Sequence, residues 1–463
     1  MLPDVALLKI FDFYLDDEGD GTKTAIEEWQ TLVHVSRKWR NVVFASPRRL
    51  NLRLCTIEKT PVRATLDIWP LLPIVLDVYI GGLFDEETDD WDEDNIIAAL
   101  EHNDRICGIS FFEFPSSKSE KFLLAMQQPF PALTSLELHF VGDTTPVQPD
   151  SFLGGSASLL QTLRLHSIPF PGLPKLLLSA THLVVLSVMG IPHSGYFSPE
   201  AFVTALSVLT SLEKLNIGFE SRRSRPTRRL PPETRILLPI LTEFFFIGVD
   251  KYLEDIIARI DAPLLDKLTV TFLHQLIFDT PQLTEFISRT PRLKGHEKAY
   301  VNLMNGKVSV ILLQSYGRRI CLGISYSDPD LQPLSLAQAC GSFFPQAFIH
   351  AVEHLYIKSS WSPLHWQPDI VESRQWLELL RPFSSVKRLY ISWQFGPHIA
   401  RALEELVEDR ATEALPSLQT LFLEEADLSG PVWEDIGQFV AARQLVGHPI
   451  AVSSWEYRPI SDD

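Results

Sequence analysis

The stretch LTSLEL at residues 133–138 returns in altered form as LQTLRL at 160–165 and LVVLSV at 183–188. Each copy places an apolar residue before two variable residues, then a second apolar residue, one variable residue and a third apolar residue. The last two apolar positions are two residues apart, so they lie on the same face of a β-strand. The spacing therefore predicts a series of short strands that each bury one face.

The same spacing recurs over residues 106–423. From Ile106 to Leu265 the copies begin 27, 27, 23, 29, 29 and 24 residues apart, and from Val352 to Leu418 they begin 34 and 32 residues apart. The apolar triplets are Ile106-Ile109-Phe111, Leu133-Leu136-Leu138, Leu160-Leu163-Leu165, Leu183-Leu186-Val188, Leu212-Leu215-Ile217, Leu241-Phe244-Phe246, Leu265-Leu268-Val270, Val352-Leu355-Ile357, Val386-Leu389-Ile391 and Leu418-Leu421-Leu423.

Helical patterns lie between the predicted strands. Ser198 offers an N-cap, Pro199 a first helical residue and Glu200 an early acid, ahead of an apolar run. Residues 370–380 and 397–415 have the pattern of amphipathic helices. Strands that alternate with helices over short connections are parallel and joined by right-handed crossovers.

This organisation resembles leucine-rich repeats, whose usual period is about 20–29 residues. The resemblance implies an α/β fold, an irregular leucine-rich-repeat-like solenoid or horseshoe with parallel strands on its concave side. The Asn or Cys that follows the LxxLxL core in that family is mostly absent here, so the backbone ladder that it supplies must be replaced or lost. The uneven repeat lengths and the 33 prolines predict an irregular solenoid.

Residues 289–345 interrupt the repeat. Asn305-Gly306 stands between two runs of strand-forming residues and suits a two-residue type I′ turn, in which both positions need positive φ. We expect a β-hairpin near residues 297–325, with RICLGISYS at 319–327 as a candidate third strand. The hairpin either replaces or decorates one repeat.

Residues 1–47 have a different pattern. Pro3 suits the first turn of a helix, and residues 29–35 and 36–44 suggest two more short helices, with Ser36 as a cap. An acidic insert occupies residues 16–24. Three helices of this size bury little, so they expose apolar surface of the kind that marks a partner site.

These residues resemble an F-box, a motif that runs Leu-Pro, an acidic or polar residue, Ile-Phe and Leu, and later Val-Cys-x-x-Trp. Ser36 stands where Cys is common, and the insert at 16–28 is longer than usual. The segments at 46–54 and 66–74 also resemble divergent F-box proteins of mushroom-forming fungi. The matching positions are Leu2-Pro3-Asp4, Ile10-Phe11, Leu15, Leu32, Val35-Ser36-Arg37 and Trp39-Arg40.

F-box proteins are substrate receptors of SCF ubiquitin ligases. The resemblance implies that residues 1–47 dock the Skp adaptor, which joins a cullin and a RING subunit, and that residues 48–463 recruit an unidentified protein substrate. The alternative is a non-catalytic repeat scaffold whose N-terminal helices only cap the solenoid. By the resemblance, the candidates for the adaptor contact or its immediate support are Leu2, Pro3, Ile10, Phe11, Leu15, Leu32, Val35 and Trp39.

Charge and composition argue against some classes of partner and indicate a cellular compartment. The net charge of −17 argues against nonspecific binding to nucleic acid or to an anionic membrane. Four scattered cysteines and the lack of an Asn-x-Ser/Thr site fit the cytoplasm or nucleus. The apolar start has Asp4 where a signal peptide needs basic residues, and no later run reaches the ~18 apolar residues of a membrane span.

Catalytic motifs are absent from the sequence apart from one spelling. His350-Ala-Val-Glu353-His354 matches HxxEH, which binds zinc only when both histidines lie on one helical face. Because Val352-Leu355-Ile357 is a repeat triplet, we expect a strand there instead. GxSxG, GxGxxG and P-loop patterns do not occur. We expect no catalytic residues, no cofactor, no metal site and no enzymatic activity.

Three further features each allow two readings. The acidic run at 85–94 and the basic run at 222–229 are each either a solvated loop or a partner site. The basic run also resembles a nuclear-import or nucleic-acid-binding patch. The late tryptophans either fill the core of the wider repeats or line a ligand surface. They are Trp361, Trp366, Trp376 and Trp393.

Overall fold

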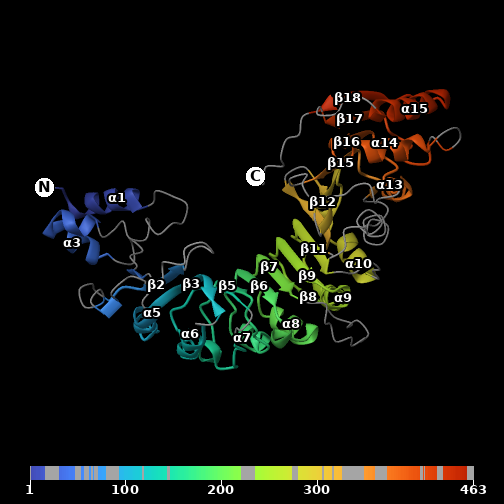
Figure 1. The fold of residues 1–463 in the computed structure, drawn as a ribbon. Coiled ribbons are helices and arrows are strands. Elements are labelled where there is room, and N and C mark those ends of the chain that lie inside the picture. Colours follow the sequence, from blue (N-terminus) through green and yellow to red (C-terminus); the bar gives the residue numbers. More distant parts are fainter. Residues whose placement is uncertain are drawn as a thin grey trace. The chain divides into compact units, whose positions relative to one another are not determined.

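A computed structural model of the chain divides into two compact units, residues 1–212 and 213–463, which are described separately (Figure 1). In the part of the chain that is described, no helix is long and apolar enough to cross a bilayer. The described residues are 2–15, 31–46, 54–56, 62–63, 66, 71–79, 93–116, 119–142, 146–220, 235–273, 280–304, 307–314, 317–325, 349–359, 373–406, 410, 412–424 and 431–455.

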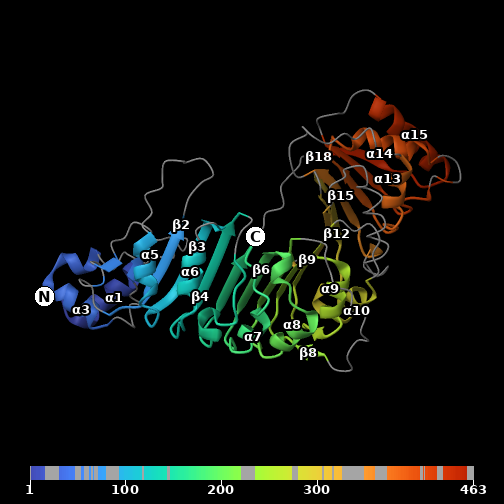
Figure 2. The ribbon, with the colours of Figure 1, turned by 60° about the horizontal axis from the view of Figure 1, so that its bottom comes forward.

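The strands of the first unit pair in the order in which they occur along the chain, each parallel to the next. Figure 2 shows them side by side. Parallel pairing of consecutive strands is the arrangement that the repeat predicts. The strands are β1 (Leu54–Thr56), β2 (Ile74–Tyr79), β3 (Ile106–Pro115), β4 (Ser135–Val141), β5 (Thr162–His166) and β6 (Val185–Ile191).

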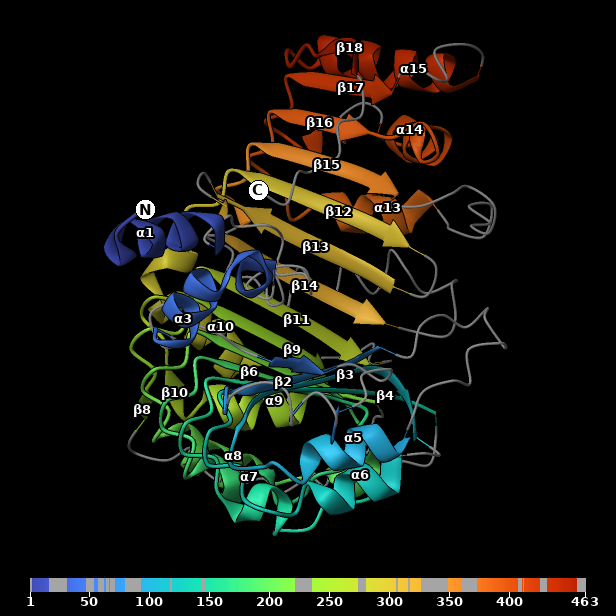
Figure 3. The same ribbon diagram turned by 90° about the vertical axis from the view of Figure 1, so that its left-hand side faces the viewer.

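The second unit has one departure from sequential parallel order. Strand β13 (Lys307–Leu313) pairs antiparallel with both β12 (Lys298–Met304) and β14 (Arg319–Ser325), whereas the other pairs are parallel. The spatial order is β7-β9-β11-β14-β13-β12-β15-β16-β17-β18 (Figure 3). The remaining strands are β7 (Lys214–Phe219), β9 (Glu243–Gly248), β11 (Lys267–Leu273), β15 (His354–Ser359), β16 (Arg388–Ile391), β17 (Thr420–Glu424) and β18 (Ala451–Trp455), with a small separate parallel pair, β8 (Ile236–Leu237) and β10 (Ile260–Asp261).

The predicted hairpin and its third strand are therefore present, and they lie within the sheet. Strand β14 takes the place beside β11, and β12 restores parallel pairing with β15. The hairpin thus neither replaces a repeat nor decorates one from outside, because it adds strands to the sheet. The turn residues Asn305 and Gly306 lie outside the described residues.

The apolar triplets form the core, as their spacing predicts. Each of their side chains is no more than 5% exposed. In the second unit the register aligns Leu355 with Leu389 and Leu421. Ala299 continues the same row on β12. The sheet therefore buries continuous rows of apolar side chains, and each strand completes the core of its neighbours.

Helices cover one face of the strands in each unit. In the first unit they are α5 (Glu93–Leu100), α6 (Ser119–Ala125), α7 (Leu173–Leu177) and α8 (Pro199–Leu206), with short 3₁₀ turns at Phe152–Gly155 and His193–Gly195 (Figure 1). Ser198 caps α8 as expected, since its hydroxyl accepts from the Ala201 N–H at 3.2 Å. In the second unit they are α9 (Asp250–Ile257), α10 (Pro281–Arg289), α13 (Ser373–Leu380), α14 (Gly396–Glu404) and α15 (Pro431–Leu445), with a 3₁₀ turn at Pro291–Leu293.

Backbone hydrogen bonds link consecutive repeats just ahead of their strands. The carbonyl just before a strand accepts two N–H groups of the next repeat. The Thr134 carbonyl accepts from Gln161 and Thr162 at 2.8 and 3.0 Å, and the Lys387 carbonyl accepts from Gln419 and Thr420 at 2.9 and 3.0 Å. These bonds join consecutive repeats ahead of the strand core, on the opposite side of that core from the family's Asn or Cys position.

Residues 2–15 and 31–46, called the head below, contain helices α1 (Asp4–Leu15) and α3 (Arg37–Phe44), and residues 31–35 are also helical. Ser36 caps α3, since its hydroxyl accepts from the Trp39 N–H at 3.2 Å. Residues 16–30, which include the acidic insert, lie outside the described part of the chain.

Candidate protein-binding surfaces

The head has a small core built from both of its labelled helices. Phe11 of α1 is fully buried, and its ring meets the Trp39 ring of α3 edge to face, with centroids 4.9 Å apart. Leu7, Val33 and Val43 are buried with Phe11. Since Leu7 and Phe11 are four residues apart, they share one face of α1, and that face packs into the core of the head.

Polar contacts fix the ends of the head helices. The Lys38 ammonium donates to the Leu2 carbonyl at 2.6 Å and lies 3.2 Å from the Asp4 carboxylate. The Arg40 guanidinium donates from Nε to the Val33 carbonyl at 3.1 Å. These bonds connect the start of α1 with α3 and hold the helix that precedes α3 against it.

The outer surface of the head is apolar. Leu2, Ile10 and Val35 are 53%, 46% and 57% exposed. Val5 and Phe13 are 65% and 84% exposed. A cluster of large apolar side chains in water on so small a unit is of the kind that marks an interaction site.

Seven of the eight residues that the F-box resemblance selects fall into two groups. Leu2, Pro3, Ile10 and Val35 are exposed, whereas Phe11 and Leu32 are buried and Trp39 is half-buried. The side chain of Leu15 is not described. The first group can touch a partner, and the second can only support the surface.

Val5 and Phe13 were not among the predicted residues. Their place follows from helical geometry, because 100° per residue puts them on the side of α1 opposite Leu7 and Phe11. A helical projection of residues 4–15 would have found them. Helix α1 is apolar on both sides, which explains why its sequence lacks one polar face.

A second surface lies on the strands of the second unit, on the face turned away from the helices; we call it the open face. Four aromatic rings stack there on four consecutive parallel strands. The rings are those of Tyr300, Tyr356, Tyr390 and Phe422, called the aromatic ladder below, with centroids 4.5, 4.2 and 4.5 Å apart and interplanar angles of 6–8°.

Trp455 of β18 bounds the aromatic ladder. Its ring meets Tyr390 and Tyr356 edge-on at 5.6 and 6.2 Å, and its indole N–H donates to the Ile391 carbonyl at 3.1 Å. At the β12 end, the Lys358 ammonium lies over the Tyr300 ring, 4.9 Å from its centroid. Ring packing thus holds the two middle rings of the ladder, and cation–π attraction holds the ring on β12.

Burial shifts the titration of these side chains. Desolvation raises the pKa of Tyr356, and the neighbouring Tyr390 and Tyr300 raise it further. Desolvation lowers the pKa of Lys358. The Tyr356 hydroxyl therefore keeps its proton across the neutral and mildly alkaline range and stays a hydrogen-bond donor.

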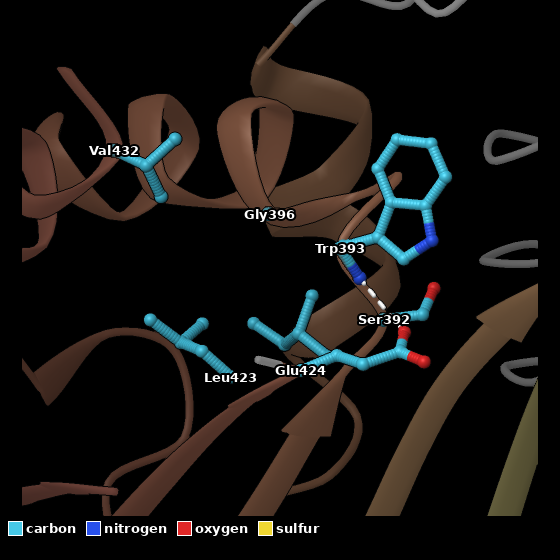
Figure 4. Close-up of a pocket in the computed structure, with 7 residues that line it drawn as sticks. Ser392, Trp393, Gly396, Leu423, Glu424 and Val432 are labelled. Carbon is cyan, nitrogen blue, oxygen red and sulfur yellow. Dashed lines mark hydrogen bonds between the residues drawn. The ribbon is translucent and has the colours of Figure 1, made fainter. Parts of the chain in front are cut away.

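A small recess lies at the carboxyl ends of β16 and β17 (Figure 4). The Trp393 N–H donates to the Glu424 carboxylate there at 3.1 Å. The Ser392 hydroxyl is buried. The lining is otherwise mostly apolar, with no convergent set of polar groups among the described residues that would orient a ligand. It is formed by Ile391, Ser392, Trp393, Gly396, Leu423, Glu424 and Val432.

The HxxEH spelling is part of a repeat, as expected. Strand β15 begins at His354, and His350 lies ahead of it, with its ring nitrogen Nδ1 2.6 Å from the Ser384 hydroxyl. The two histidines are therefore not on one helical face. Among the described residues, no group of three or more His, Cys, Asp or Glu side chains is placed to hold a metal ion.

The late tryptophans separate into core and surface. Trp376 is fully buried and packs against Phe395 at 5.7 Å between centroids, whereas Trp393 is 40% exposed. Trp361, Trp366 and the basic run at 222–229 lie outside the described residues, as does most of the acidic run at 85–94.

Comparison with known proteins identifies no family. No model of a known protein family matches the chain, and no curated protein matches it. Among solved structures, a leucine-rich repeat-containing protein, LegL7, from Legionella pneumophila is similar over 83% of this chain and 97% of its own, with 14% identity and a TM-score of 0.28. The repeat fold assigned to this chain rests on its own sheet topology and buried triplets.

Proposed function

We propose that the chain is a substrate-receptor subunit of an SCF-type cullin-RING ubiquitin ligase. In this role the head docks the Skp adaptor, and the repeats hold a protein substrate near the ubiquitin-charged enzyme. Transfer gains by proximity, and the receptor itself performs no bond chemistry. The chain acts in the cytoplasm or nucleus and needs no cofactor.

The observation that carries the proposal is the exposed apolar surface of the head. Ile10 and Phe13 lie one turn apart on α1, and both side chains face water while Phe11 between them fills the core. A helical cap would turn such residues toward the repeats. The F-box resemblance supplies the partner for this surface, and the repeat fold suits a protein-binding scaffold.

The proposal is tested by co-purification of the full chain with a fungal Skp adaptor. We expect the wild-type chain to retain the adaptor and the double variant Pro3→Ala with Ile10→Asp to lose it. Leu445→Asp is the matched control, because Leu445 is 87% exposed at the end of α15 and lies outside the head. Failure of the wild-type chain to bind, or retention of the adaptor by the double variant, would contradict the proposal.

The alternative of a scaffold with a capping head makes a different prediction. If the head only caps the repeats, its removal exposes their apolar end and lowers the urea midpoint of the remaining chain. If the head is an adaptor-binding unit, removal of residues 1–47 leaves that midpoint nearly unchanged while adaptor binding disappears.

A further inference from the structure

Three neighbouring parallel strands begin with the same kind of triplet. Strand β12 starts Lys298-Ala299-Tyr300, β15 starts His354-Leu355-Tyr356, and β16 starts Arg388-Leu389-Tyr390. The register aligns the three basic residues with one another and the three tyrosines with one another. Because the middle residue of each triplet is buried, the flanking side chains stand on the open face. The result is a basic row beside the aromatic ladder. Its charge at neutral pH comes from the exposed Lys298 and Arg388, because desolvation and these two cations lower the pKa of the half-buried His354 between them.

We propose that these two rows bind an extended acidic segment of a partner protein. The open-face positions of β12 to β16 also carry the half-buried Lys307 and Arg319, whereas Lys358 is only 6% exposed and lies over the Tyr300 ring. On the described residues of these strands that face holds no carboxylate. The whole chain has a net charge of −17. A basic surface on so acidic a protein selects an acidic ligand by charge complementarity.

Nearby carboxylates do not neutralise the positive charge of this surface. Glu353 precedes β15 and pairs with Lys387, whose ammonium lies 2.6 Å from its carboxylate. Glu243 lies farther along the sheet, where Lys267 and Lys214 pair with it at 2.9 and 3.5 Å. Among the described residues, Glu297 ahead of β12 and Glu424 on the open face of β17 also lie beside the rows, and the Glu424 carboxylate accepts from the Trp393 N–H. Lys298 and Arg388 are both exposed.

The geometry of the aromatic ladder favours a polypeptide over a nucleic acid. Bases bind proteins by stacking on free aromatic faces. In the ladder the ring faces between neighbouring strands are covered by one another, since adjacent rings are nearly parallel, and the Lys358 ammonium lies over the Tyr300 ring. Trp455 packs edge-on against Tyr390 and Tyr356. The other ring edges and the tyrosine hydroxyls remain, and ring edges carry positive partial charge. Edges, hydroxyl donors and a cationic row together suit carboxylates and small apolar side chains.

The size of the surface sets the length of the bound segment. Four strands about 4.8 Å apart span roughly 14 Å, which about four or five extended residues cover at about 3.3 Å each. That this segment belongs to a ubiquitination substrate rests on the proposed function above. The binding itself does not, because it needs neither the head nor the adaptor.

The test uses the full chain without adaptor and a fluorescein-labelled peptide in which glutamate alternates with leucine. We expect fluorescence anisotropy to show binding that weakens with added salt, and about tenfold weaker binding after Lys298→Glu with Arg388→Glu. The control is Lys251→Glu with Arg374→Glu, which makes the same change of charge on exposed helical positions of the same unit. We expect this control to bind within about twofold of wild type.

Three results would overturn the proposal. These are no binding of the glutamate peptide at low ionic strength, equal losses in the two double variants, and equally tight binding of oligouridylate or of the corresponding lysine peptide. Lys298→Gln with Arg388→Gln provides a second test that introduces no new repulsion and should weaken binding in the same direction. Because the assay contains no adaptor, its failure would leave the ligase proposal standing, and failure of adaptor binding would leave this one standing.

Discussion

Phe11 of α1 and Trp39 of α3 meet edge to face in the core of the head, with their ring centroids 4.9 Å apart. This contact orients α1 so that Ile10 and Phe13 face water. The exposed apolar surface is thus a consequence of how the head folds, and it is available to a partner only while that fold holds.

Phe11→Ala should unfold the head. Removing a buried phenylalanine costs about 3–5 kcal/mol, which a core of this size cannot absorb. Limited proteolysis of the full chain should then cut within residues 2–46 at a much higher rate, while the repeat fragment persists. Phe13→Ala is the matched control, since Phe13 is 84% exposed. Unchanged resistance of Phe11→Ala would show that the head is not an independent core.

Leu389→Ala should destabilise the second unit by about 2–5 kcal/mol. Leu389 is fully buried and aligns with Leu355 and Leu421, so the cavity would interrupt a continuous apolar row. Urea unfolding followed by circular dichroism measures the effect. Leu445→Ala should shift stability by less than about 0.5 kcal/mol because Leu445 is exposed. Equal shifts in the two variants would refute the row as a source of stability.

Acid should weaken the fold through His296. Burial lowers the pKa of His296 to about 4, so the unfolded chain takes up its proton first as the pH falls below about 6.5. The stabilisation is fully present above that pH and is lost as the pH falls toward 4, for a total of about 3 kcal/mol.

The variant His296→Leu isolates this contribution. The loss of unfolding free energy between pH 7 and pH 4.5 should be smaller in His296→Leu than in the wild-type chain. His182→Gln should lose as much as wild type, because His182 is exposed. An identical pH dependence in wild type and His296→Leu would contradict the assignment.

The repeat core could be predicted from sequence because a strand that buries one face needs apolar residues at a fixed local spacing. All ten predicted triplets are buried, and strands occur where the triplets predict them. Strands β1, β2, β8, β10 and β18 were not predicted. Strand β2 buries Ile74, Leu76 and Val78. Leu71-Ile74-Leu76 has the repeat spacing, but Leu71 is 86% exposed and lies between Pro70 and Pro73. Strand β18 has two serines where its neighbours have apolar or aromatic residues.

The order β11-β14-β13-β12-β15 could not be predicted, because it depends on pairing between segments far apart in sequence. Asn305-Gly306 indicates that β12 and β13 are antiparallel, but no local signal says which of them meets β15. The basic row and the aromatic ladder could not be predicted from the sequence for the same reason. The triplets at 298–300, 354–356 and 388–390 can be read in the sequence, yet they form rows only through the register.

The affinity of the full chain for the purified Skp adaptor, measured by isothermal titration calorimetry, tests the central claim most directly. We predict saturable binding by the wild-type chain and by Leu445→Asp, and a loss of about tenfold or more in both Ile10→Asp and Phe13→Asp, since each buries a charge in an apolar interface. No measurable binding by the wild-type chain, or wild-type affinity in both head variants, would contradict the account.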